Sequence, residues 1–219
     1  MDQREIPLVI SYLFLRRAIG IIGILFPFIL VTGSVVAGGC TEIQPTISDY
    51  YHTNMRDVFV GTLCAVALFL FSYRGYNYMD NIAGNLACIF ALGVAFFPAS
   101  ATEPLAPCNH TAATHHPLIG KIHLVAAGLF FIVLACFSLF LFTRGVSMPT
   151  PEKLIRNKIY RICGFVILAC IMLLLLFYSL PSFDFYLKKY KLVFWIETIA
   201  LWAFGISWLI KGQYLLRDK

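Results

Sequence analysis

Long apolar runs separated by short polar segments dominate this chain. A helix that crosses a bilayer needs about 20 predominantly apolar residues, and six runs qualify, although the second and third are short. They cover residues 18–38, 57–73, 81–98, 118–143, 160–180 and 192–210. The pattern predicts an all-α fold, a polytopic transmembrane bundle of about six helices, with residues 1–219 forming one domain.

The segment before the first span is also apolar. Arg16 and Arg17 interrupt the hydrophobic run that begins near the N-terminus, and no small-x-small cleavage site follows it. A signal peptide is therefore the weaker interpretation. We expect residues 6–15 to form a separate helix that lies along the inner membrane surface.

A regular alanine row marks the run at 81–98. Alanine recurs at every fourth position in this run, at Ala83, Ala87, Ala91 and Ala95. Residues four apart lie on one face of a helix, and small residues let a second helix approach closely inside a membrane. The row predicts close helix packing.

Composition agrees with a membrane protein and argues against nucleic acid as a partner. The chain is 60% hydrophobic and 13% charged, whereas soluble domains carry about 45–50% apolar and about 25% charged residues. The net charge of +6 comes from basic residues that lie between apolar runs and form no stripe. The expected partners are membrane lipids and a second copy of the chain or another membrane protein.

The distribution of Lys and Arg predicts the orientation in the membrane. Twelve of the 17 Lys and Arg residues lie in the two terminal segments and in the second and fourth loops. The other five lie in the remaining loops and helix ends, at Arg56, Lys121, Lys188, Lys189 and Lys191. Because cytoplasmic segments are enriched in Lys and Arg, both termini are expected in the cytoplasm.

The seven cysteines divide by position. Five lie within the apolar runs, where a thiol behaves as a small apolar group: Cys64, Cys88, Cys136, Cys163 and Cys170. Cys40 and Cys108 lie in the first and third loops, which are predicted to be outside the cell. An oxidising compartment permits a disulfide between them, but sequence alone leaves the pairing open because the geometry decides it.

Ionisable side chains gather at the predicted outer ends of the helices. All five histidines map there: His52, His110, His115, His116 and His123. Arg56 and Asp57 stand at the mouth of the second run, and both His123 and Glu197 lie about 7–8 Å into their helices at a rise of 1.5 Å per residue. A charge at that depth is costly unless it pairs or lines a wet cavity. These features predict a polar pocket that opens outward between the runs at 57–73, 118–143 and 192–210.

Each of these residues also has a purely structural interpretation. Arg56 and Asp57 could pair with each other at the membrane surface, and His123 could bond to a main-chain carbonyl. Glu197 requires a partner in an otherwise apolar helix, for which Arg56 and His123 are the candidates. The full candidate ligand-binding set is Asp49, His52, Arg56, Asp57, His123 and Glu197.

Four segments resemble a family of uncharacterised bacterial membrane proteins. Residues 47–53 (ISDYYHT) and 56–61 (RDVFVG) carry the resemblance most strongly, and 80–87 (DNIAGNLA) and 197–205 (ETIALWAFG) extend it. The resemblance implies a six-span protein of the bacterial inner membrane. The family has no settled biochemical activity.

Two further resemblances concern the segment before the second run. Residues 45–49 (PTISD) resemble the entry to the second span of damage-regulated autophagy modulators and GPI-anchor-remodelling membrane proteins, which also have six helices. The spacing Ser48-x-x-x-His52 is similar to the first motif of the alkaline ceramidase and adiponectin-receptor superfamily of zinc-dependent membrane hydrolases. This chain lacks the late His-x-x-x-His pair of that superfamily and offers Glu197 in its place.

Three classes of function follow. The leading hypothesis is a protein that binds a lipid headgroup or a small anionic ligand in the outer pocket. The alternative is a zinc-dependent lipid hydrolase, with His52, His123 and Glu197 as metal ligands and with Ser48, Asp57 and Glu197 as catalytic candidates. The third is a haem protein with His52 and His123 as axial ligands.

Overall fold

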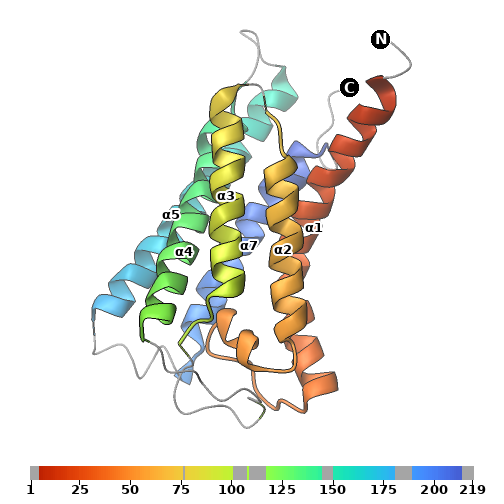
Figure 1. Cartoon of the computed structure of the whole chain (residues 1–219). Coiled ribbons are helices and arrows are strands. Elements are labelled where there is room, and N and C mark those ends of the chain that lie inside the picture. Colours follow the sequence, from red (N-terminus) through yellow and green to blue (C-terminus); the bar gives the residue numbers. More distant parts are fainter. Residues whose placement is uncertain are drawn as a thin grey trace.

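The computed structural model describes residues 5–75, 77–100, 108, 117–144, 150–180 and 189–213, with side chains described from Tyr12 onward. Within these residues the chain is helical and contains no strand (Figure 1). The elements are α1 Glu5–Gly38, the 3-10 helix η1 Ser48–His52, α2 Arg56–Ser72, α3 Tyr78–Phe96, α4 Pro117–Cys136, the π-helical segment η2 Phe137–Leu141, α5 Pro151–Ser179 and α7 Leu192–Lys211. The prediction of an all-α fold is confirmed.

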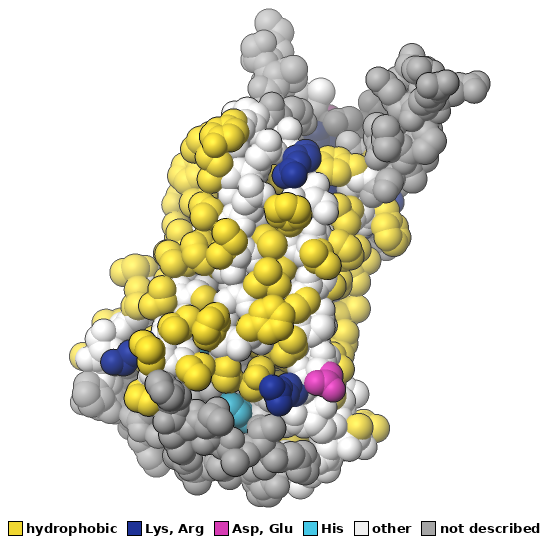
Figure 2. Space-filling model, in the orientation of Figure 1, with side chains coloured by type: hydrophobic (Ala, Val, Ile, Leu, Met, Phe, Trp, Pro, Cys, Tyr) yellow, Lys and Arg dark blue, Asp and Glu magenta, His cyan; other side chains and the backbone are white. Residues whose placement is uncertain are grey.

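Among the described helices, five are long and apolar enough to cross a membrane. They are Tyr12–Gly38 of α1, Tyr78–Phe96, Pro117–Leu141, Pro151–Ser179 and Leu192–Lys211. The remaining helix, α2, has 17 residues and lies beside α3 over nearly the same height (Figure 1). Hydrophobic side chains cover most of the face seen in Figure 2, and the charged and histidine side chains in view lie near its two ends. The chain is therefore an integral membrane protein with several membrane-spanning helices.

The N-terminal segment differs from the sequence-based expectation. A separate helix over residues 6–15 was expected, but α1 runs without a break from Glu5 to Gly38. Arg16 and Arg17 do not interrupt the helix, because both guanidinium groups donate to the end of α7. Arg16 Nη1 donates to Lys211 O at 3.5 Å, and Arg17 Nε donates to Gly212 O at 2.8 Å.

The helices alternate in direction, so α1 begins and α7 ends at the same end of the bundle (Figure 1). We call this the basic end, because Arg16, Lys153, Arg156 and Lys211 lie there. The opposite end, where α2, α4 and α7 begin, carries the disulfide between Cys40 and Cys108 and is called the disulfide end.

Two close helix contacts form the core. At the crossing of α1 and α7, a Cβ on Gly20 would lie 2.8 Å from Gly205 O, and a Cβ on Gly205 would lie 2.7 Å from Gly20 O. The alanine row of α3 packs as predicted, since Ala87, Ala91 and Ala95 are buried and Ala83 is partly buried against the core. Small residues allow the backbones of two helices to approach closely. Van der Waals contact then stabilises the helix pair, because lipid provides no hydrophobic driving force for helix association.

The glycine contact gives a test of the packing. Gly205→Ala places a methyl group against the backbone of α1, and overpacking of this kind costs about 1–3 kcal/mol. We expect a lower midpoint of thermal unfolding in detergent for this variant. Gly128→Ala is the matched control, because nothing lies within 4 Å of its added Cβ. Equal unfolding temperatures for the two variants would contradict the proposed crossing.

Candidate functional site at the disulfide end

The segment between α1 and α2 folds into the disulfide end of the bundle. We call residues 40–55 the plug loop. Several of its side chains are almost fully buried, although the loop is not a long helix: Cys40, Gln44, Ile47, Asp49, Tyr50, His52, Thr53 and Met55. Such burial requires the polar groups of the loop to find partners inside the protein.

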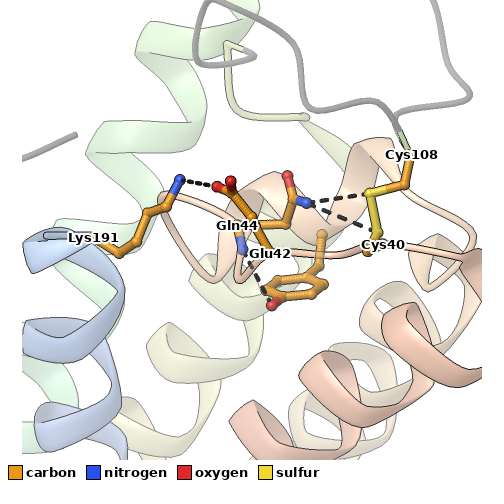
Figure 3. Close-up of polar contacts among 6 residues, drawn as sticks. Cys40, Glu42, Gln44, Cys108 and Lys191 are labelled. Atoms are coloured by element: carbon orange, nitrogen blue, oxygen red, sulfur yellow. Dashed lines mark hydrogen bonds and ion pairs between the residues drawn. A yellow bond between two sulfur atoms is a disulfide. The ribbon is translucent and has the colours of Figure 1, made fainter. Parts of the chain in front are cut away.

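A disulfide closes the outer side of the plug loop. Cys40 is bonded to Cys108, the pairing that the sequence left open (Figure 3). The Gln44 side-chain amide points at this disulfide, and its Nε2 lies 3.4 Å from Cys108 Sγ. The Gln44 main-chain N–H donates to the Tyr50 hydroxyl at 3.3 Å. Burial raises the pKa of Tyr50 above its ordinary value, so this phenol is a neutral acceptor.

The first turns of α7 hold the inner side of the plug loop. The Ile47 main-chain N–H donates to Glu197 Oε2 at 2.7 Å, and the Phe194 N–H donates to Pro45 O at 3.1 Å. An ion pair of 3.4 Å joins Lys191 Nζ to Glu42 Oε2 nearer the surface (Figure 3). The expected side-chain partners of Glu197 were Arg56 and His123, and the observed partner is instead a main-chain amide.

His123 of α4 joins the plug loop to the end of α3. Its Nδ1 lies 2.7 Å from Phe97 O and its Nε2 lies 2.9 Å from Ser48 Oγ. A carbonyl can only accept, so Nδ1 carries a proton; in the neutral ring Nε2 then accepts from the Ser48 hydroxyl. His52 uses its Nε2 in a similar way and donates to Ala99 O at 2.9 Å. Both imidazoles therefore fasten the plug loop and the α3 terminus together.

A small cavity lies behind the plug loop. It has a volume of about 50 Å³, which is room for a few water molecules. Ser48 and Glu197 supply its polar lining, and the rest of the wall is apolar: Phe26, Ile47, Phe59, Leu63, Val94, Ala127, Phe130, Phe131 and Leu201. The outward-opening polar pocket expected between α2, α4 and α7 is thus filled by the plug loop, and a small inner cavity is left.

Arg56 and Asp57 lie apart from this cavity. Both side chains are exposed in the first turn of α2. Arg56 Nη2 donates to the Tyr51 hydroxyl at 2.8 Å, and its guanidinium stacks on the Tyr51 ring at 4.6 Å. An open surface groove of about 380 Å³ is lined by Tyr51, Arg56, Asp57 and Phe96, among others. Thr53 and Met55 form the junction before α2, where Thr53 Oγ1 accepts from the Met55 N–H at 3.1 Å.

The donor groups do not form a metal centre in the part of the chain that the structure describes. Within it, no three His, Cys, Asp or Glu side chains are close enough to hold a metal ion. A zinc ligand needs a free imidazole nitrogen, whereas both ring nitrogens of His123 are engaged, Nδ1 with Phe97 O and Nε2 with Ser48 Oγ. The proposed zinc set of His52, His123 and Glu197 therefore does not fit, and no chemical step is derived through a metal. His110, His115 and His116 lie outside the described residues.

A larger groove that the sequence reasoning missed runs between α3 and α4. It has a volume of about 690 Å³ and is open along its length. Its lining is apolar apart from one lysine: Ile89, Phe90, Leu92, Gly93, Phe96, Phe97, Leu118, Lys121, Ile122, Val125, Ala126 and Leu129. The sequence pattern indicates Lys121 only as one of the five cations of the odd-numbered loops and helix ends. The spacing of Leu118, Lys121, Ile122 and Val125 on one face of α4 is the signal that could have indicated the groove.

No protein-family model, no curated protein and no solved structure matches this chain.

The Glu197 contact can be tested by substitution. Glu197→Leu leaves the Ile47 N–H buried without an acceptor, which costs about 1–3 kcal/mol. Glu197→Gln keeps an acceptor oxygen, so its unfolding temperature should lie between those of the wild type and Glu197→Leu. Glu152→Gln, at the basic end, is the control and should be close to the wild type. Thermal unfolding in detergent measures all three, and an unchanged Glu197→Leu protein would disprove the anchoring role.

The disulfide gives a second stability test. Removing a native disulfide costs about 2–5 kcal/mol in small domains, and Cys40→Ser frees the outer side of the plug loop. We expect faster proteolysis between residues 40 and 55 than in the wild type. Cys136→Ser, which changes a free thiol in α4, should leave the proteolysis rate unchanged. Equal rates in all three proteins would show that other contacts suffice to hold the loop.

Proposed function

We propose that this integral membrane protein binds a glycerophospholipid at the disulfide end, with acyl chains in the groove between α3 and α4 and the phosphate beside Lys121. The observation that carries the proposal is the groove itself, which is apolar along α3 and α4 and has one cation in its lining. The function is therefore recognition of a membrane lipid, in keeping with the leading hypothesis from the sequence.

The groove suits an acyl chain because of where it lies. Its wall residues Ile89, Phe96, Leu118 and Val125 are 59–62% exposed on helices that cross the membrane. A concave apolar surface inside a bilayer is filled by hydrocarbon, so its natural occupant is a lipid tail. Gly93 brings α3 close to α4 at the groove floor, where a Cβ on it would lie 2.9 Å from Ala126 Cβ.

The headgroup end of the groove is positively charged. Lys121 lies in the second turn of α4 and is exposed. A lysine at this depth extends its amine toward the headgroup region and keeps its methylene groups on apolar surface. Arg56 lines the smaller groove beside Tyr51, and Phe96 lines both that groove and the α3–α4 groove.

Hydrolysis is the weaker proposal. Ser48 and His123 form a hydrogen-bonded pair at 2.9 Å, which is the geometry of a nucleophile and its base. However, the main-chain N–H groups of Ile47 and Asp49 beside Ser48 are already donated to Glu197 and Thr46. These two neighbouring amides are therefore engaged within the loop and do not point to an oxyanion site. The contacts of His123 with Ser48 Oγ and Phe97 O anchor the plug loop.

The orientation and location belong to the same proposal. We place the disulfide end outside and both termini in the cytoplasm, because disulfides persist in oxidising compartments and Lys and Arg are enriched in cytoplasmic segments. The resemblance to an uncharacterised bacterial family supports an inner-membrane location, and a homo-oligomer or a membrane protein partner remains part of this proposal.

Native mass spectrometry of the full chain in detergent tests the lipid site. We expect phosphatidylglycerol to bind, and Lys121→Ala to weaken that binding by about tenfold, the effect of losing one charge-assisted hydrogen bond of about 1.5 kcal/mol. Gly93→Leu, which places a side chain in the groove, should also reduce binding. Lys189→Ala is the control, because it removes a cation at the same end that does not line the groove. Equal binding by the Lys121 and Lys189 variants would refute the proposal.

A further inference from the structure

The smaller groove at the disulfide end presents one basic and one acidic side chain. Arg56 and Asp57 stand in the first turn of α2, and both side chains are exposed. The groove has a volume of about 380 Å³, and its described lining comes from η1, α2 and α3: Tyr51, Arg56, Asp57, Val60, Gly61, Ala95 and Phe96. The lipid site beside Lys121 uses neither of these two charges.

The two charges do not neutralise each other. Arg56 Nη2 donates to the Tyr51 hydroxyl at 2.8 Å, and the guanidinium carbon lies 4.6 Å from the centre of the Tyr51 ring. Arg56 is therefore held by Tyr51, and among the described residues it forms no ion pair with Asp57. A guanidinium carries several N–H donors, and the bond to Tyr51 uses one of them. The groove thus keeps a positioned cation and a separate carboxylate.

Gly61 keeps the groove open on the α2 side. It lies four residues after Asp57 and therefore on the same face of the helix. A Cβ on Gly205 would meet the backbone of α1, whereas nothing lies within 4 Å of a Cβ added to Gly61. Glycine weakens a helix interior relative to alanine, and helix packing does not require one here. The free space above Gly61 belongs to the groove that it lines.

The groove lies where lipid headgroups meet the protein. Arg56 and Asp57 begin α2, which runs beside α3 through the bundle (Figure 1). Phe96 is the last residue of α3 and is 62% exposed. Tyrosine and charged side chains at the ends of apolar helices are typical of the membrane–water interface. A ligand in this groove therefore contacts apolar side chains and ionic groups together.

The opposite charges favour a ligand that carries both signs. An anion alone would be repelled by Asp57, and a cation alone would be repelled by Arg56. A guanidinium binds phosphate oxygens well, because its planar N–H groups match their geometry. A primary ammonium can donate hydrogen bonds to a carboxylate, whereas a quaternary ammonium has no N–H to donate. The complementary ligand is therefore a phosphate joined to a primary amine.

We propose that the groove between α2 and α3 binds a phosphoethanolamine group, with its phosphate on Arg56 and its ammonium on Asp57. The group belongs either to phosphatidylethanolamine or to a soluble compound, and its recognition chemistry is the same in both. This site is separate from the α3–α4 groove and does not depend on Lys121.

Two binding measurements on the full chain in detergent test the site. Both use a Lys121→Ala background, so that lipid held beside Lys121 does not contribute. Native mass spectrometry compares phosphatidylethanolamine with phosphatidylcholine, and equilibrium dialysis with radiolabelled phosphoethanolamine detects a soluble ligand. We expect phosphatidylethanolamine to bind about fivefold more tightly than phosphatidylcholine, because an exposed ion pair contributes up to about 1 kcal/mol.

Three substitutions in that background address the groove. Arg56→Gln and Asp57→Asn each remove one charge and should weaken binding of phosphatidylethanolamine by about fivefold. Gly61→Leu keeps both charges and fills the groove without a clash in the fold, so it should weaken binding at least as much. Glu42→Gln is the matched control, because it changes an exposed carboxylate at the same end that does not line the groove.

Each outcome decides the proposal. Weaker phosphatidylethanolamine binding in the three groove variants, with binding kept in Glu42→Gln, supports a headgroup site. The same pattern with soluble phosphoethanolamine identifies a soluble ligand. Unchanged binding in the groove variants overturns the site and leaves the Lys121 site untouched. If a variant fails to fold, the background protein decides, since equal binding of phosphatidylethanolamine and phosphatidylcholine, or no binding of phosphoethanolamine in either form, overturns the proposal.

Discussion

The hydrogen bond from the Ile47 main chain to the Glu197 carboxylate is the contact on which the disulfide end depends. Inside a bilayer each main-chain polar group needs an internal partner, so non-helical backbone is tolerated only where the protein supplies one. The plug loop brings such backbone into the bundle, and α7 supplies the acceptor at Glu197 and a donor at Phe194. The position of Ser48 next to His123 follows from this attachment.

The two ends of the molecule differ in how their charged and polar side chains are paired. At the disulfide end, His52, His123 and Glu197 are matched by partners within the chain. At the basic end, Arg16 keeps a buried donor without a partner in the described part of the chain, and Lys211 faces three other cations. The disulfide end is therefore closed by hydrogen bonds within the chain, whereas like charges gather at the basic end.

Residues that look catalytic in the sequence serve a structural purpose in this arrangement. Serine, histidine and glutamate near a membrane surface suggest hydrolysis, and the chain does place Ser48 beside His123. Their hydrogen bonds, however, run mainly to main-chain atoms of the plug loop and of the α3 terminus. The same polar groups that could perform chemistry are needed to bury a loop without unsatisfied amides. The groove along α3 and α4, by contrast, is lined by almost no polar residues.

The sequence by itself determined the helical architecture, the alanine packing face and the gathering of polar residues at one end, because these depend on periodicity and on the transfer of apolar side chains into hydrocarbon. It did not determine the continuity of α1, since Arg16 and Arg17 donate to main-chain carbonyls 195 residues away, at the end of α7. Only the tertiary structure decided that Glu197 meets the Ile47 amide, that Cys40 meets Cys108 and that Arg56 turns to Tyr51. Such pairings depend on where loops fold, and hydrophobic pattern does not encode the path of a loop.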